Sequence, residues 1–280
     1  MSKFLIIGLG WLGYPLAREL KGAGAIVAGS TRSESKIHAL KNENIGAFHY
    51  DLYLSNDADI NSERISNAHV VINIPPGRRN FDKALFIKQI KALLDYCIAN
   101  KAKQIIFIST TSVFGALTHK VNNHSPLSPN TPSGEAHVEI EQYLQAKSVT
   151  TGKECQISVL RLSGLVGLNR HPINTIAIKK GITQGKNPVN LVHLDDVIQT
   201  LIALSKRVER SFYAANLCST EHPSRQEYYT WCAKELKLSL PEFAPDERLD
   251  IDGKIIDASE TLKDNDITLK YPSPFMMLPD

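Results

Sequence analysis

Three glycines near the amino terminus, Gly8, Gly10 and Gly13, have the spacing of a phosphate-binding turn. The apolar run Phe4–Ile7 precedes them, and apolar residues at helical spacing follow them. In such a turn the first glycine permits the bend, the second lets the backbone approach a pyrophosphate, and the third lets the helix pack on the strand. A structural turn without a ligand is the alternative, but the helix amino terminus also offers N–H groups to phosphates. We therefore predict a dinucleotide site at Gly8, Gly10, Trp11, Leu12 and Gly13.

Polar residues at the exit of the next strand indicate the type of dinucleotide. Ala25–Ala28 predicts that strand, and Ser30, Thr31 and Arg32 follow it. An acid at this exit would bind the ribose 2′-hydroxyl of NAD, whereas hydroxyls and a guanidinium suit a 2′-phosphate. We therefore predict NADP, with NAD as the alternative; a role for Arg32 as a surface charge is the competing interpretation.

Three later strands end in residues that can contact a ligand, because ligands bind at the carboxyl edge of open α/β sheets. The third predicted strand ends at Asp51 and Leu52, the fourth at Ile74 and Pro75, and the fifth at Ser109. We predict that these five residues contact the cofactor. The four hydroxyls of residues 109–112 can also bind a substrate oxygen, although ordinary turn chemistry explains them equally well.

The order of the predicted elements indicates the fold class. Strands over 4–7, 25–28, 47–50, 70–74, 104–109, 156–160 and 212–216 alternate with helices, among them 34–42, 81–100 and 134–147. Such alternation predicts an α/β fold with a doubly wound parallel sheet, the Rossmann fold. We assign residues 1–168 and 187–217 to the nucleotide-binding domain. Residues 169–186 and 218–280, which include a capping box at Ser224 and Glu227, are expected to form a small substrate or lid lobe.

The composition excludes several classes of protein. The 280 residues carry a net charge of +3 without a long basic block, so we expect no nucleic-acid partner. Four scattered cysteines, without partners at ligand spacing, predict neither disulfides nor a metal site. The first strand begins at Lys3 and no apolar run approaches a membrane span, so we expect a soluble cytoplasmic protein without a membrane partner.

Three longer motifs resemble those of a known family. Residues 108–115 (ISTTSVFG), 160–170 (LRLSGLVGLNR) and 192–197 (VHLDDV) are similar, in this order, to motifs of the extended short-chain dehydrogenase/reductases. This family includes the NAD-dependent sugar-nucleotide epimerases and dehydratases, and the resemblance spans nearly the whole chain. It implies a Rossmann fold, an NAD(P) cofactor and an active-site hydroxyl at Thr110.

The chain departs from that family where the chemistry takes place. In the family's glycine turn, the first two glycines are separated by one residue more than Gly8 and Gly10 are here. Ile7 occupies the position of the family's first glycine. Its Tyr-x-x-x-Lys pair, in which the lysine lowers the pKa of the catalytic tyrosine, falls on Ser133 and His137. His137 could substitute as acid and base, since its reference pKa is about 6.5. The alternative is that His137 is a structural polar residue.

A literal Tyr-x-x-x-Lys match, Tyr143 and Lys147, lies later in the same helix. Tyr143 stands 18 residues before Arg161, against 28 for Ser133, which leaves too little helix for the usual crossover. We interpret Tyr143 as a packing residue, and the predicted catalytic residues are Thr110, Ser133 and His137.

These observations support three functions. The first is an epimerase-like oxidoreductase with an altered proton relay, acting on a nucleotide sugar or a small carbonyl compound. The second is a catalytically silent NADP-binding regulatory protein, which the loss of the tyrosine and lysine motivates. The third is a β-hydroxyacid dehydrogenase-like enzyme, because residues 8–17 (GLGWLGYPLA) also resemble that family's opening. In each case we expect a small-molecule partner, and a homodimer.

Overall fold

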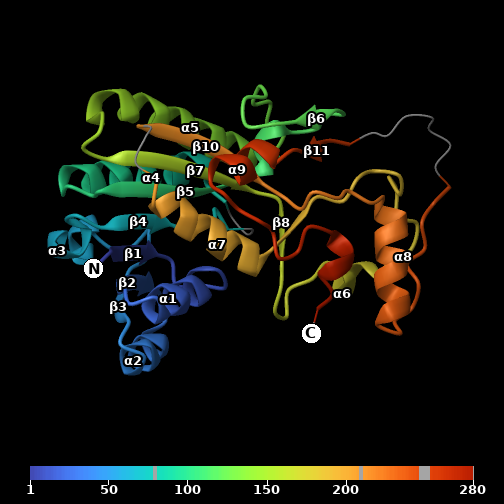
Figure 1. Cartoon of the computed structure of the whole chain (residues 1–280), viewed down its shortest axis with the longest axis horizontal. Coiled ribbons are helices and arrows are strands. Elements are labelled where there is room, and N and C mark those ends of the chain that lie inside the picture. Colours follow the sequence, from blue (N-terminus) through green and yellow to red (C-terminus); the bar gives the residue numbers. More distant parts are fainter. Residues whose placement is uncertain (78–80, 208–210, 246–252, 280) are drawn as a thin grey trace. The chain divides into compact units, whose positions relative to one another are not determined.

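Within the described residues, seven strands form the central sheet, in the spatial order β10 (Phe212–Leu217), β7 (Gln156–Leu162), β5 (Gln104–Thr110), β4 (His69–Ile72), β1 (Lys3–Ile7), β2 (Ile26–Thr31) and β3 (Gly46–His49) (Figure 1). The pairs β1–β2, β1–β4, β2–β3 and β4–β5 are parallel. The computed structural model describes residues 1–77, 81–207, 211–245 and 253–279. The chain divides into two compact units, Met1–Thr110, Thr131–Leu160 and Leu201–Ala214, and Thr111–Asn130, Arg161–Thr200 and Ala215–Asp280.

Helices connect the strands of the first unit. They are α1 (Gly13–Gly22), α2 (Glu34–Asn42), η1 (Asp57–Ile60), α3 (Ser62–Ile65), α4 (Lys83–Ala99) and α5 (Pro132–Thr151), and α7 (Leu194–Ser205) precedes β10. Helices α4 and α5 lie side by side (Figure 1), and Lys91 of α4 pairs with Glu139 of α5 at 2.6 Å between Nζ and Oε1.

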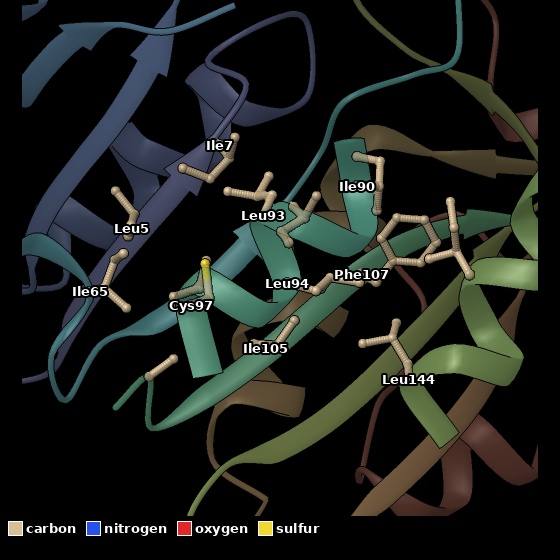
Figure 2. Packing of buried hydrophobic residues seen from close by; sticks show 14 of the residues in the cluster. Leu5, Ile7, Ile65, Ile90, Leu93, Leu94, Cys97, Ile105, Phe107 and Leu144 are labelled. Carbon is tan, nitrogen blue, oxygen red and sulfur yellow. The ribbon is translucent and has the colours of Figure 1, made fainter. Parts of the chain in front are cut away.

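Alternate residues of β1 show that helices cover both faces of the sheet. Leu5 and Ile7 belong to the buried apolar cluster that also contains Leu93 of α4 and Leu144 of α5 (Figure 2). Ile6 points to the opposite face, since successive side chains of a strand alternate, and a β-carbon on Gly13 of α1 would lie 3.1 Å from its Cγ2. The prediction of a doubly wound α/β sheet is therefore confirmed.

Side chains cap several of the described helices. Asp82 accepts a hydrogen bond from the Leu85 N–H at the start of α4, and Thr131 accepts one from the Gly134 N–H at the start of α5. One half of the predicted capping box is confirmed, because Ser224 Oγ accepts from the Glu227 N–H. Such a cap typically stabilises a helix by about 1 kcal/mol. Ser33 occupies the N-cap position of α2, but its side chain makes no capping hydrogen bond.

The boundaries of several predicted elements were wrong. Strand β2 continues to Thr31, because its pairing with β1 and β3 extends beyond Ala28. Strand β4 ends at Ile72 instead of residue 74, since the two prolines at 75 and 76 lack the N–H that sheet pairing needs. Helix α5 runs to Thr151, four residues beyond the predicted end.

The second unit contains short elements around an apolar cluster of its own. They are η2 (Thr111–Phe114), β6 (Lys120–Val121), β8 (Gly164–Val166), α6 (Ile173–Ile176), β9 (Leu191–His193), α8 (Arg225–Glu235), β11 (Ile255–Ile256), α9 (Ser259–Asp264) and η3 (Pro274–Met276). Strands β6 and β11 form one small parallel sheet and β8 and β9 another. Neither β8 nor β11 was predicted from the sequence. Within the described residues, the α-helices α6, α8 and α9 are 4, 11 and 6 residues long. They do not match the long helical domain of a β-hydroxyacid dehydrogenase.

Candidate functional site

The glycine turn between β1 and α1 has a conformation that other residues cannot adopt. Gly8 has a φ of +109°, and a β-carbon there would lie 2.4 Å from the carbonyl oxygen of Asn73. A β-carbon on Gly13 would lie 2.1 Å from the carbonyl oxygen of Gly8, so the helix packs directly on the turn. At Gly10, by contrast, a β-carbon would meet no further atom of the described residues within 4 Å. The turn is closed against the protein at its two ends and open at its centre.

Two side chains from neighbouring strands fix this turn. Ser30 of β2 accepts a hydrogen bond from the Gly8 N–H with its Oγ at 3.0 Å. Asn73, which follows β4, donates from Nδ2 to the Gly8 carbonyl oxygen at 3.2 Å. Ser30 is only 2% exposed, so its hydroxyl holds the protein backbone. Asn73 was missed by sequence analysis, because no local pattern marks a residue that reaches the turn from another strand.

A hollow of about 440 Å³ opens beside the turn. Nine of the predicted cofactor residues line it: Gly8, Gly10, Ser30, Thr31, Arg32, Asp51, Leu52, Ile74 and Pro75. Eight lining residues were not predicted: Leu9, Ser33, Lys36, Tyr50, Tyr53, Asn73, Pro76 and Gly77. The tyrosines follow the third strand and could have been suspected as ring-stacking partners for a base.

Charged residues of both signs lie at the mouth of this hollow. Arg32 is 77% exposed in its side chain, and its Nη1 lies 3.7 Å from Oδ2 of Asp51, whose side chain is 14% exposed. Lys36, in the first turn of α2, lines the same hollow. Asp51 also accepts a hydrogen bond from the Tyr53 N–H at 2.9 Å, which fixes its carboxylate. The two cations can bind an anionic group, and Asp51 competes with it for Arg32.

Four predicted cofactor residues do not line the hollow. Leu12 is the N-cap residue of α1 and provides no side-chain acceptor for the first N–H groups of that helix. The Tyr14 N–H donates to the Gly10 carbonyl oxygen at 3.0 Å and Pro15 has no N–H, so a ligand anion would have to accept from N–H groups that precede Tyr14. Gly13 packs against the turn, and Trp11 lies between Gly10 and Leu12. Ser109, at the end of β5, donates its hydroxyl to Oε1 of Glu141 at 2.5 Å and is 4% exposed.

The predicted catalytic residues lie on β5 and α5, outside the lining of this hollow. Thr110 is the last residue of β5, and Ser133 lies in the first turn of α5. His137, one turn further along, is 5% exposed and contacts the rings of Phe86 and Phe107 at centroid distances of 6.3 and 5.7 Å. The structure therefore places His137 in an apolar setting between α4 and β5.

The surroundings of His137 favour its neutral form. Burial lowers the pKa of His137 below its ordinary value, while a hydrogen bond to the Ser133 carbonyl oxygen and the charge of Glu141 act in the opposite direction. The bond joins Nδ1 to that oxygen at 2.8 Å. Since a carbonyl oxygen only accepts, Nδ1 carries the proton and Nε2 is the basic nitrogen of the neutral ring.

The literal Tyr-x-x-x-Lys match has partners on α4. Tyr143 donates its hydroxyl to Oδ2 of Asp95 at 2.6 Å, and Lys147 Nζ lies 2.6 Å from Oδ1 of the same carboxylate. Both Asp95 contacts bridge α4 and α5. The interpretation of Tyr143 as a packing residue remains a prediction.

The open glycine turn fits a dinucleotide. A pyrophosphate could approach the backbone at Gly10, and Arg32 and Lys36 line the same hollow. Among the described residues, no group of three or more His, Cys, Asp or Glu side chains could hold a metal ion. No helix in the described ranges is long and apolar enough to cross a membrane.

Comparison with known proteins identifies relatives of the whole chain. Residues 4–211 match the NAD dependent epimerase/dehydratase family. Protein YeeZ of Escherichia coli K12 is 33% identical over 282 residues, which cover 99% of each chain. The UDP-Glc/GlcNAc 4-epimerase of Campylobacter jejuni has a similar fold, with a TM-score of 0.79, 18% identity and coverage of 99% and 97% of the two chains. MoeE5 in complex with UDP-glucose and NAD has a TM-score of 0.81 at 17% identity, covering 98% of this chain and 95% of MoeE5.

Proposed function

The chain belongs to the NAD-dependent epimerase/dehydratase family, and from this premise we propose that it is a nicotinamide-dinucleotide oxidoreductase acting on a nucleotide sugar or small carbonyl compound. The geometry of the glycine turn carries the proposal. Gly8 and Gly13 are locked against the protein, whereas Gly10 faces an open hollow. A turn without a ligand would have no need of an open glycine at its centre.

We propose NADP as the preferred cofactor. Arg32 and Lys36 both line the hollow, and Thr31 lies beside them at the end of β2. Two cations can offset the charge of a 2′-phosphate, and a guanidinium can bind it with two parallel hydrogen bonds. Asp51, paired with Arg32, would have to share that guanidinium with the phosphate, which limits the preference for NADP.

Calorimetric titration with NADP, NAD and their reduced forms tests the cofactor. We expect NADP to bind at least about tenfold more tightly than NAD, because a charge-assisted hydrogen bond contributes about 1.5–3 kcal/mol. The Gly10→Ala variant should weaken both forms about tenfold. Gly22→Ala, at the end of α1, is the matched control, since a β-carbon there also meets open space. Absence of binding by any form would contradict the proposal.

We propose that the substrate is a nucleotide sugar or a small carbonyl compound bound near the end of β5. Two proteins of similar fold support the first class: one is a UDP-Glc/GlcNAc 4-epimerase and the other was solved with UDP-glucose. The bound dinucleotide would exchange a hydride with a substrate carbon. Thr110, the last residue of β5, would hold the substrate oxygen with its hydroxyl. Titration of the NADP-loaded protein with UDP-glucose, followed by measurement of reduced-cofactor absorbance, tests this step.

A silent NADP-binding regulatory protein is the second candidate, and the burial of His137 between two phenyl rings favours it. It predicts tight NADP binding together with no change in reduced-cofactor absorbance for any nucleotide sugar or small carbonyl compound. Turnover of one such compound would exclude it.

We also propose that the protein is a cytoplasmic homodimer. The four cysteines are free and buried, as suits a reducing compartment. Leu85 of α4 and Val149 of α5 are 38% and 81% exposed, which supports a partner on these helices. Light scattering of the purified protein should give twice the 31.1 kDa chain mass, and cell fractionation tests the compartment. A monomer mass at micromolar concentration would contradict the dimer.

A further inference from the structure

Glu141 of α5 is a buried carboxylate to which no role has been assigned above. Glu141 is 3% exposed and accepts the hydrogen bond from Ser109 at the end of β5. Burying a carboxylate is strongly unfavourable unless hydrogen bonds and charges compensate for the lost water. The other carboxylates along this helix, Glu135 and Glu139, are exposed and pair with lysines of α4. The position of Glu141 therefore needs an explanation that a surface ion pair does not provide.

The spacing along α5 places Glu141 next to His137. Ser133, His137 and Glu141 follow one another at intervals of four residues, so they share one face of the helix. His137 Nδ1 donates a hydrogen bond to the carbonyl oxygen of Ser133, one turn earlier in the helix. The negative charge of Glu141, one turn later, raises the pKa of the His137 ring. From α4 and β5, the groups in ring contact with His137 are Phe86 and Phe107, which carry no charge. Glu141 is thus the charged group that acts on this imidazole.

We propose that His137 is the proton acceptor of this site, with Glu141 as the residue that positions and stabilises its protonated form and Ser109 as the residue that holds Glu141. The inference deepens the proposed function and rests on it. It assigns to a histidine and a carboxylate one helical turn apart the proton transfer that the family's tyrosine and lysine perform.

The proposed step is the oxidation of a substrate alcohol to a carbonyl compound. The substrate carbon would give up a hydride, and with it both electrons, to the nicotinamide dinucleotide. The hydroxyl O–H bond breaks, its proton goes to Nε2 of His137, and a C=O double bond forms. His137 then carries a positive charge, which the carboxylate of Glu141 stabilises in the same way that an aspartate stabilises a catalytic imidazolium. In the reverse direction the imidazolium returns the proton to the carbonyl oxygen.

Titration of the His137 ring by NMR in the cofactor-free protein tests the coupling directly. The variant Glu141→Gln removes the charge and keeps the shape of the side chain. We expect the pKa of His137 to fall by about one unit in this variant, because the imidazolium loses its neighbouring anion. The matched control is Glu139→Gln, which removes an exposed charge from the same helix and should leave that pKa unchanged. Equal shifts in both variants, or none in Glu141→Gln, would overturn the proposal.

A second measurement on the wild-type protein keeps the proposal testable if Glu141→Gln does not fold. The nitrogen chemical shifts of neutral His137 should show the proton on Nδ1, because the Ser133 carbonyl oxygen accepts it. A proton on Nε2 would overturn the proposal, since that nitrogen could not then accept another.

Failure of the proposed oxidoreductase function can be distinguished from failure of the role proposed for Glu141. If no dinucleotide binds but the pKa shift is present, the proposed oxidoreductase function fails while the coupling of His137 to Glu141 stands. If NADP binds normally and the shift is absent, only the role of Glu141 fails. Once a substrate is identified, Glu141→Gln should move the acidic limb of the kcat profile to lower pH and leave the Kd for NADP unchanged.

Discussion

The glycine turn and the β5–α5 region belong to the same unit, yet they are built in opposite ways. The turn has no side chain at its centre, and Gly10 faces a hollow of about 440 Å³. In the β5–α5 region, Ser109, His137 and Glu141 are 4%, 5% and 3% exposed and interact with one another or with nearby backbone. The first region offers backbone to a ligand, and the second holds polar side chains against the core.

This difference indicates how a family fold could keep its glycine turn while its acid–base residues change, as the sequence predicts here. A backbone conformation at positive φ with a close helix contact admits only glycine, so the turn has one solution. Proton transfer needs a group of suitable pKa at a suitable place, and several side-chain types satisfy that requirement. The predicted alignment of Ser133 and His137 with the family's tyrosine and lysine would be an exchange of this kind.

The largest expected effect comes from Gly13→Ala in the turn. Its β-carbon would lie 2.1 Å from the Gly8 carbonyl oxygen, which cannot move away without breaking the turn. We expect the free energy of unfolding to fall by about 3 kcal/mol or more, whereas Gly10→Ala should unfold like the wild type. Urea denaturation measures both. Equal stability of the two variants would contradict the contrast between closed and open glycines.

In the β5–α5 region, His137→Ala should lower both stability and turnover. Removing a ring packed between Phe86 and Phe107 is expected to cost about 2–3 kcal/mol in urea denaturation. If His137 accepts the proton, the rate on an identified substrate should fall by about 100-fold. An unchanged rate would show that His137 is a structural residue and does not accept the proton.

The pH dependence of the free energy of unfolding should also report the lowered pKa of His137. Because burial lowers its pKa, the unfolded chain binds a proton more readily than the folded one. The contribution of His137 to stability is therefore complete above its unfolded pKa of about 6.5 and is lost as the pH falls below that value. Between about pH 7.5 and 5.5 the wild type should lose more stability in urea than His137→Gln. A parallel loss in both proteins would argue against a lowered pKa.

A smaller effect is expected from Arg32→Ala at the mouth of the hollow. It should weaken NADP about tenfold and NAD much less, since only NADP carries the 2′-phosphate. Arg18→Ala is the matched control, because Arg18 is also exposed and pairs with Glu43, outside the lining of the hollow. Equal weakening of NADP and NAD in calorimetry would remove the cofactor assignment.

The smallest effect is expected from Tyr143→Phe. Its hydroxyl binds Asp95 near the surface, so its loss should cost less than about 1 kcal/mol and leave turnover unchanged. Loss of turnover in this variant would identify Tyr143 and Lys147 as the proton relay. The assignment of proton transfer to His137 would then be wrong.

The sequence by itself determined the features that depend on local chemistry. The spacing of Gly8, Gly10 and Gly13 after an apolar strand predicted which glycine would bend, which would stay open and which would pack. The serine and glutamate of the capping box predicted the start of α8. The alternation of strands and helices predicted the doubly wound sheet. Each of these signals lies within one turn or one strand–helix unit, where residue type and spacing restrict the backbone directly.

Only the tertiary structure decided which polar side chains meet. Ser30 reaches Gly8 across 22 residues, Asn73 reaches it across 65, and Ser109 meets Glu141 across 32. A serine at the end of a strand has the same local sequence signature whether its hydroxyl binds a cofactor, a backbone N–H or a buried carboxylate. Its partner depends on how the strands are ordered and on which face of α5 packs against β5. Long-range packing therefore assigned Ser30 to the turn and Ser109 to Glu141.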